Sequence, residues 1–87
     1  MKIKLTQEAK SLIQKMHPEI KKGLRSSLES LSKNKHFGKA LHDELEGFYS
    51  LRYKNYRLIY SIENNLIIIQ YVGHRAQVYE DFALLLQ

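Results

Sequence analysis

Three arginines and one tyrosine in the second half of the chain could bind a phosphate group and stabilise charge on it. They are Arg52, Arg57, Arg75 and Tyr79. Arginine carries N–H donors in a fixed fork that matches phosphate oxygens two at a time. Several such groups together could hold a nucleic-acid backbone and stabilise the negative charge that develops on a reacting phosphate. The tyrosine ring could stack on an unpaired base, as recognition of single-stranded RNA commonly requires.

The charge balance is compatible with this interpretation, but by itself it fits a soluble basic surface equally well. The chain has 14 Lys and Arg against 9 Asp and Glu, a formal net charge of +5, and such a balance points to nucleic acid or an acidic protein as a partner. The alternative is that each arginine pairs with a surface carboxylate such as Glu46, Glu63 or Glu80. That alternative is favoured for a single arginine, whereas three together on a basic chain favour phosphate.

Residues 47–79 must position these side chains, and they read as three consecutive antiparallel strands, a turn and the start of a helix. Lys54-Asn55 and Asn64-Asn65 predict two-residue hairpin turns, because asparagine tolerates the positive φ that such turns require. The strands between these turns are Phe48–Tyr53, Tyr56–Ile62 and Leu66–Val72.

Counting outward from the two turns predicts which residues face each other. The same count pairs Arg57 with Val72 and so brings it close to the turn that holds Arg75. One face of the sheet is apolar, with the pairs Leu51 and Leu58, Tyr49 and Tyr60, and Ile62 and Ile67.

The reverse face of the predicted sheet is polar. Arg52 lies directly across from Arg57, and Ser50 lies opposite Ile59 with Gln70 beyond it. Like charges opposed on a sheet repel each other and cost stability. The pair of arginines therefore indicates that an anion binds on this face.

The N-terminal part of the chain supplies a cover for the apolar face. Lys2–Leu5 alternates polar and apolar residues, which suits a short strand. Thr6 can cap a following helix, and Pro18 suits the first position of a second helix. Apolar stripes run along both helices: Ala9, Leu12, Ile13 and Met16 on the first, and Ile20, Leu24, Leu28 and Leu31 on the second. Both stripes need a partner surface, which the apolar face of the sheet provides.

A short C-terminal helix is predicted at Val78–Leu86, with Val78, Phe82 and Leu85 at helical spacing toward the sheet. The elements then follow the order β-α-α-β-β-β with a final helix. The sequence predicts an α+β fold in which two N-terminal helices pack on a twisted antiparallel sheet.

The segment Asn34–Glu46 is less regular and is expected to be a loop with at most one helical turn. His36, His42 and Asp43 lie within it, but their spacing does not suit a metal site, and solvated loop residues are the better interpretation. The chain has no cysteine, which excludes a thiolate nucleophile and a zinc–thiolate site. We expect neither a metal nor another cofactor.

Length and hydropathy bound the overall organisation. The 87 residues are expected to form one domain, residues 1–87, and the apolar content is sufficient for a core. The N-terminus lacks the apolar run of a signal peptide, and the longest aliphatic run, Leu66–Ile69, is too short to cross a bilayer. The expected location is the cytoplasm.

Two motifs, LRYKNYRLIY and VGHRAQVY, resemble the RelE/ParE toxin superfamily of type II toxin–antitoxin systems. The ending Gly-His-Arg-x-x-Val-Tyr resembles the RelE branch more than the ParE branch. The N-terminal strand and two helices are similar as well, so the resemblance covers nearly the whole chain. It implies a RelE-like fold with a concave basic face opposite the two helices.

The resemblance also implies an activity and partners. RelE-like toxins are messenger RNA interferases that enter the ribosomal A site, where the 2′-hydroxyl of the messenger attacks the adjacent phosphate. By position, Arg57 and Arg75 match the arginines that stabilise this phosphate, and Tyr79 matches the tyrosine that orients or stacks on the substrate. Arg52 matches a basic position on the preceding strand. The expected partners are a cognate antitoxin, the ribosome and messenger RNA.

Further RNA contacts are expected from the same face, at Arg52, Lys54, Ser50 and Gln70. Two lysines that RelE members carry on the strand before the hairpin are replaced here by Phe48 and Ser50. Another general base is then required, and His74 is the candidate, because imidazole titrates near physiological pH. Neighbouring strand residues point to opposite faces, however, so His74 and Arg75 need not reach the same phosphate.

The replaced lysines leave two other functions open. One is a ParE-like toxin that binds DNA gyrase and has no nuclease activity. The other is a catalytically inactive relative that has kept the fold as a binding module. The Gly-His-Arg turn favours the ribonuclease.

Overall fold

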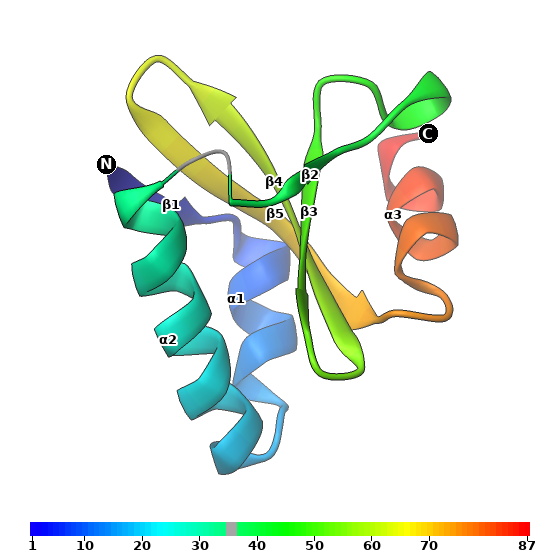
Figure 1. Ribbon diagram of the computed structural model, residues 1–87. Helices are drawn as coiled ribbons and strands as arrows, with labels where there is room; N and C mark the ends of the chain where they lie inside the picture. The colour runs from blue at the N-terminus through cyan, green and yellow to red at the C-terminus, as the bar shows by residue number, and fades with distance from the viewer. Residues whose placement is uncertain (35–36) are drawn as a thin grey trace.

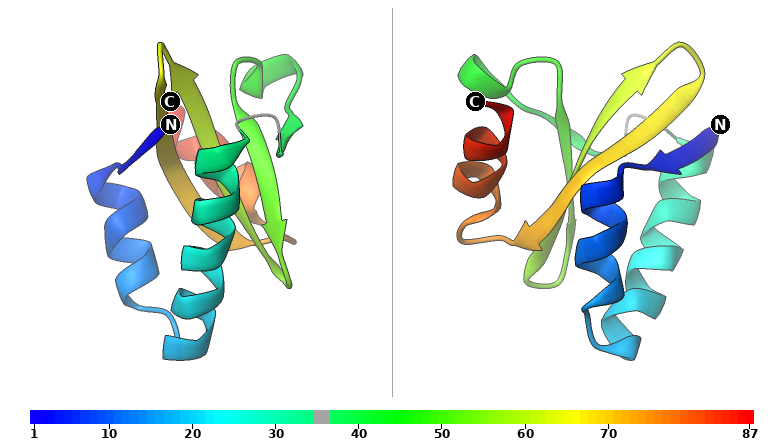
Figure 2. Two further views of the ribbon diagram at one scale, coloured as in Figure 1. Left: turned by 60° about the vertical axis from the view of Figure 1, so that its left-hand side comes forward. Right: turned by 180° about the vertical axis from the view of Figure 1, so that it is seen from behind.

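A mixed sheet of five strands runs through the part of the chain that the computed structural model describes, residues 1–34 and 37–87. Its strands are β1 (Lys2–Leu5), β2 (Lys39–Ala40), β3 (Tyr49–Tyr53), β4 (Tyr56–Glu63) and β5 (Leu66–His74). The helical elements are α1 (Gln7–Gln14), α2 (Pro18–Lys33), the short 3₁₀ helix η1 (Asp43–Leu45) and α3 (Val78–Leu86). The strand order is β1-β5-β4-β3-β2. Helices α1 and α2 lie side by side on one face and α3 lies on the other (Figures 1 and 2). The predicted α+β fold is confirmed.

The central strands form the two hairpins that the turn residues predict, with β3–β4 and β4–β5 both antiparallel. Lys54 and Asn64, the first residue of each turn, have φ values of 52° and 56°. These values lie in the left-handed region that tight hairpin turns require. Strand β1 is parallel to β5, so the sheet is mixed rather than antiparallel throughout.

The predicted pairs on the apolar face are all present, and so is the pair of arginines on the reverse face. The observed partners are Leu51 and Leu58, Tyr49 and Tyr60, Ile62 and Ile67, Ser50 and Ile59, and Arg52 and Arg57.

One part of the predicted register is wrong. A β-bulge in the β4–β5 ladder leaves Gln70 as an extra residue in β5. Arg57 therefore lies opposite Gly73 and not Val72, and Tyr71 takes the place predicted for Gln70 opposite Ile59. Counting from a turn cannot detect a bulge, because the extra residue shifts the pairing without changing the turn itself.

The larger core lies between the sheet and the two N-terminal helices. Its buried residues are Ala9, Leu24, Leu31, Leu51, Leu58, Tyr60, Ile67, Ile69 and Val72. Thr6 caps α1 as predicted, since its Oγ1 accepts a hydrogen bond from the N–H of Ala9 at 3.1 Å, and Pro18 opens α2. A Cβ at Gly23 would overlap the ring of Tyr53, so this glycine lets α2 approach β3 closely.

A smaller core lies on the opposite face, where α3 packs against the sheet. Val78 and Phe82 of α3 are buried there with Leu45 and Ile59. Leu85, predicted to face the sheet, is instead 49% exposed. Leu84 and Leu86, its neighbours in the last turn of α3, are exposed as well, at 65% and 50%.

The segment Asn34–Glu46 contains more structure than the predicted loop. Its helical turn is η1, but β2, which pairs antiparallel with β3, was not predicted. Two residues are too few to show an alternating pattern. His36 lies outside the described residues. In the residues that the structure does describe, none of the helices has both the length and the apolar character needed to cross a bilayer.

Tyr60 gives the fold a testable dependence on pH. The side chain is fully buried, and this burial raises the pKa of its phenol above the ordinary value of 10.0. The phenol of Tyr60 therefore ionises less readily in the folded state than in the unfolded state. Its contribution to the free energy of unfolding is fully present below the unfolded pKa of about 10 and is lost as pH rises above that value. We expect Tyr60→Phe to lose less free energy of unfolding between pH 8 and pH 11 than the wild type, measured by urea titration. Equal losses in the two proteins would contradict this assignment.

Candidate phosphate-binding site

Three side chains from three elements meet on the sheet face opposite α1 and α2. The Nη1 of Arg57 donates a hydrogen bond to the Oγ of Ser50 at 3.0 Å, and the hydroxyl of Tyr79 donates to the same oxygen at 3.0 Å. A serine hydroxyl has two lone pairs and can accept both bonds. We call these residues, Ser50, Arg57 and Tyr79, the Ser50 cluster.

Strand register explains how the cluster forms. Ser50 lies opposite Ile59 in the β3–β4 ladder, so Arg57, two residues before Ile59, is its diagonal neighbour on the same face. Diagonal neighbours are within reach of a long side chain. Tyr79 is the second residue of α3, whose packing through Val78 fixes where the ring can lie. Ser50 is only 1% exposed, so it anchors the other two from below.

The opposed arginines avoid each other by binding different partners. The Nε of Arg52 donates to the carbonyl oxygen of Lys54 at 3.0 Å, whereas Arg57 binds Ser50. Lys54 holds its ammonium group 5.7 Å from the centre of the Tyr53 ring. Over residues 1–34 and 37–87, no ion pair with a carboxylate is formed by Arg52, Arg57 or Arg75. Their positive charge is therefore available to an anion.

Arg75 and His74 lie at the end of β5, next to Arg57. The N–H of Arg75 donates to the carbonyl oxygen of Asn55 at 2.7 Å, which continues the β4–β5 ladder past Gly73, the partner of Arg57. This bond holds the backbone of Arg75, the first residue after β5, beside the hairpin turn that precedes Arg57. Arg75 is exposed, so its guanidinium group is free to reach a ligand there.

His74 lies on the other face of the sheet. Its ring packs edge-on against Tyr56, with centroids 6.0 Å apart, and its Nδ1 accepts a hydrogen bond from the N–H of Ala76 at 3.3 Å. Tyr56 lies two residues before Leu58 in β4 and so points to the same face, where Leu58 belongs to the core beneath α1 and α2. The structure does not bring His74 to the Ser50 cluster.

Two further residues singled out by the sequence have structural partners. Gln70, the bulged residue, donates to the Oγ of Ser61 at 3.0 Å, on the same face but further along β4 than the cluster. Phe48 packs edge-to-face on Phe82, with centroids 5.0 Å apart. Phe48 thus serves the smaller core.

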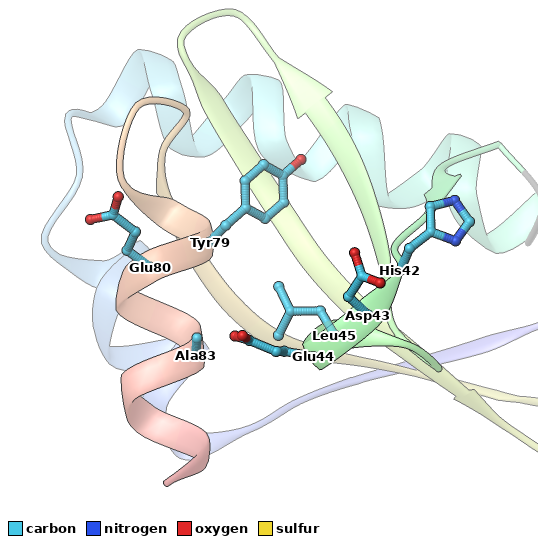
Figure 3. A pocket seen from close by; sticks show the side chains of 7 residues that line it. All are labelled: His42, Asp43, Glu44, Leu45, Tyr79, Glu80 and Ala83. Atoms are coloured by element: carbon cyan, nitrogen blue, oxygen red, sulfur yellow. The ribbon is translucent and has the colours of Figure 1, made fainter.

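A hollow of about 350 Å³ adjoins the Ser50 cluster. It lies between α3 and η1, and its lining residues are His42, Asp43, Glu44, Leu45, Tyr79, Glu80 and Ala83. Figure 3 shows Tyr79 and Ala83 of α3 facing the η1 side, whereas the carboxylate of Glu80 points away. The residues from η1 were not predicted as part of a site. The acidic run Asp43-Glu44 is the feature of the sequence that could have drawn attention to them. Among the described residues, no group of three His, Asp or Glu is placed to hold a metal ion.

A family model and several solved structures match the chain, whereas no curated protein sequence does. The family described as "ParE toxin of type II toxin-antitoxin system, parDE" matches residues 3–79.

Solved structures also match the chain over most of its length. The RelBE2 toxin–antitoxin complex of Mycobacterium tuberculosis is 33% identical with a TM-score of 0.72, over 86% of this chain and 91% of that chain. The isolated RelE toxin of E. coli is 16% identical with a TM-score of 0.74, over 99% and 98%. The YoeB–YefM complex from Staphylococcus aureus is 23% identical with a TM-score of 0.72, over 85% and 95%. The last two similarities concern the fold alone.

Proposed function

The chain belongs to the RelE/ParE superfamily of type II toxin–antitoxin toxins, and from this we propose that it is a ribosome-dependent endoribonuclease that cleaves messenger RNA in the A site. The observation that carries the proposal is the Ser50 cluster. Arg57 and Tyr79 are held on one hydroxyl, and the backbone N–H of Arg75 binds the carbonyl of Asn55, two residues before Arg57, which supports a role for Arg75 in the same site. A bound phosphate would meet two forked cations with no competing carboxylate on either of them among the described residues.

In the proposed reaction, the ribose 2′-hydroxyl gives its proton to a base and its oxygen bonds to the adjacent phosphorus. The bond between phosphorus and the 5′-oxygen breaks, and that oxygen takes up a proton. The products are a cyclic phosphate and a 5′-hydroxyl. Arg57 and Arg75 stabilise the added charge on the phosphate oxygens, and the ring of Tyr79 stacks on a base that has left its stack. We do not assign the base to His74, because it lies on the opposite face.

The remaining polar residues bind the messenger in this proposal. Arg52 and Lys54 lie at the exposed β3–β4 hairpin, where they can contact the RNA backbone, and Ser50 positions Arg57. Gln70 is further along the face and is bound to Ser61, so its contribution is the smallest. The partners are a cognate antitoxin, whose acidic or amphipathic segment neutralises this basic toxin, and the ribosome, which places the action in the cytoplasm.

Primer extension on a defined messenger in a purified translation system tests the proposal. We expect the wild type to cut within the A-site codon only when ribosomes are present. Arg75→Ala should lower the cleavage rate by about 10²-fold, since it removes one charge-stabilising donor. Arg25→Ala, which removes the same charge from an exposed position of α2, should cleave like the wild type. Equal rates for the two variants would exclude a role for Arg75.

The second candidate is a ParE-like toxin that binds DNA gyrase without cutting nucleic acid. Its support is the name of the matched family and the absence of lysine at Phe48 and Ser50, where RelE-like toxins carry it. Inhibition of gyrase supercoiling by a protein that leaves messenger RNA intact would favour this candidate. Inactivity in both assays would indicate a binding module with the toxin fold.

A further inference from the structure

Lys39 is the residue of β2 that shares a sheet face with the Ser50 cluster. In the β2–β3 ladder, Lys39 lies opposite Ser50 and Ala40 lies opposite Tyr49. Directly opposed residues of an antiparallel pair point to the same side of the sheet. Tyr49 packs against the core beneath α1 and α2, whereas Ser50 binds Arg57 and Tyr79 on the other side. Lys39 therefore stands on the side of the cluster.

Positive charge flanks Ser50 from both neighbouring strands. Arg57 approaches it from β4, and Lys39 lies across from it on β2. Opposed Cα atoms in an antiparallel pair are about 4.5–5.5 Å apart, and the flexible stem of lysine can carry its ammonium group over its partner. Ser50 is almost completely buried, so an anion held by Arg57 above it would lie within reach of Lys39.

The positive charge of Lys39 is also available to a ligand. It is exposed, and within the described residues it forms no ion pair with a carboxylate. An exposed lysine without a partner is usually only a solvated surface charge. Here its strand position places it against a buried serine whose other neighbours are an arginine and a tyrosine, which is an arrangement suited to a bound phosphate.

We propose that Lys39 is a further phosphate-binding residue, which contacts the backbone of single-stranded RNA from the β2 side while Arg57 contacts it from the β4 side. The inference rests on the proposed function for the identity of the ligand. Lys39 neutralises charge on the phosphate and moves no proton.

A binding experiment tests the contact without any cleavage. The probe is a short, fluorescently labelled 2′-O-methyl RNA, which lacks the attacking hydroxyl, titrated with purified toxin at several salt concentrations. Each phosphate contact to a single strand contributes about 0.7 to the slope of log K against log salt. We expect Lys39→Gln to reduce the magnitude of this negative slope by about 0.7. Lys39→Arg should keep the slope of the wild type.

Two control variants separate position from charge. Lys22→Gln removes the same charge from an exposed position of α2 and should leave the slope unchanged. The double variant Lys39→Ala/Ala40→Lys keeps the net charge but moves the lysine to the other face of β2, so it should behave like Lys39→Gln. A double variant that binds like the wild type, or a Lys39→Gln slope equal to that of Lys22→Gln, would overturn the inference.

Cleavage in the translation system is measured in parallel, and Lys39→Gln should lower the single-turnover rate, because one cation that neutralises the phosphate is lost. A wild type that binds the probe with the expected slopes but does not cleave would refute the proposed function while supporting the role of Lys39. A wild type whose binding to the probe shows no dependence on salt would overturn the inference itself.

Discussion

Replacing Arg57 with alanine is expected to lower the single-turnover rate of messenger cleavage by roughly 10²- to 10³-fold, the range for loss of one donor that stabilises a transition state. Arg57 is partly buried, and among the described residues only its Nη1 is engaged, by the Oγ of Ser50 at 3.0 Å. The rest of its fork can therefore bind phosphate oxygens. The measurement is a time course of primer extension with ribosomes and toxin in excess over messenger.

Variants at neighbouring positions make the result specific to Arg57. Arg57→Lys keeps the charge without the fork and should lie between wild type and Arg57→Ala. Arg52→Ala should have a smaller effect, because Arg52 is exposed and its Nε is bound to the carbonyl of Lys54. If Arg57→Ala cleaves at the wild-type rate while Arg52→Ala does not, the phosphate lies nearer the hairpin tip than we propose.

Replacing Phe82 with alanine is expected to lower the free energy of unfolding by about 3–5 kcal/mol. Phe82 is 1% exposed, and its ring meets Phe48 edge-on at 5.0 Å and Tyr71 at 5.9 Å. Because the total free energy of unfolding of a protein is only about 5–15 kcal/mol, urea titration should show a large shift of the unfolding midpoint.

Leu85→Ala is the matched control on the same helix. Leu85 is 49% exposed, so its loss should change the free energy of unfolding by less than about 0.5 kcal/mol. A similar cost for both substitutions would contradict the docking of α3 through Phe82. Phe82→Ala should also weaken RNA binding, since α3 carries Tyr79 and its undocking removes the tyrosine from Ser50.

Much of the fold could be predicted because it depends on local signals. Hairpin turns mark the limits of β3 and β4, Thr6 and Pro18 mark the starts of α1 and α2, and the alternation of apolar residues sets the two faces of the sheet. The bulge at Gln70 escaped prediction because an extra residue within a strand leaves no mark at the turns from which the register is counted. Strand β2 escaped because a two-residue strand is defined only by its partner.

The candidate site was predicted in part for the same reasons. Register alone put Ser50, Arg52 and Arg57 on one face. What it could not show is that Ser50 joins Arg57 to Tyr79, because that contact depends on how α3 docks. His74 was the candidate base, with the reservation that neighbouring strand residues face opposite ways, and its contact with Tyr56 places it on the far side of the sheet from Arg57. Lys39 is not among the predicted site residues, since the segment around it is expected to be a loop.

The two rims of the sheet bear on how separate copies of this protein behave at high concentration. An edge strand offers unpaired N–H and C=O groups to any other chain, and long, flat edges promote aggregation. Here one rim is β1, four residues long with Lys2 and Lys4 exposed, and the other is β2, two residues long and led by Lys39. Short strands with lysines at both rims disfavour pairing between copies. The sheet therefore carries its own protection against self-association.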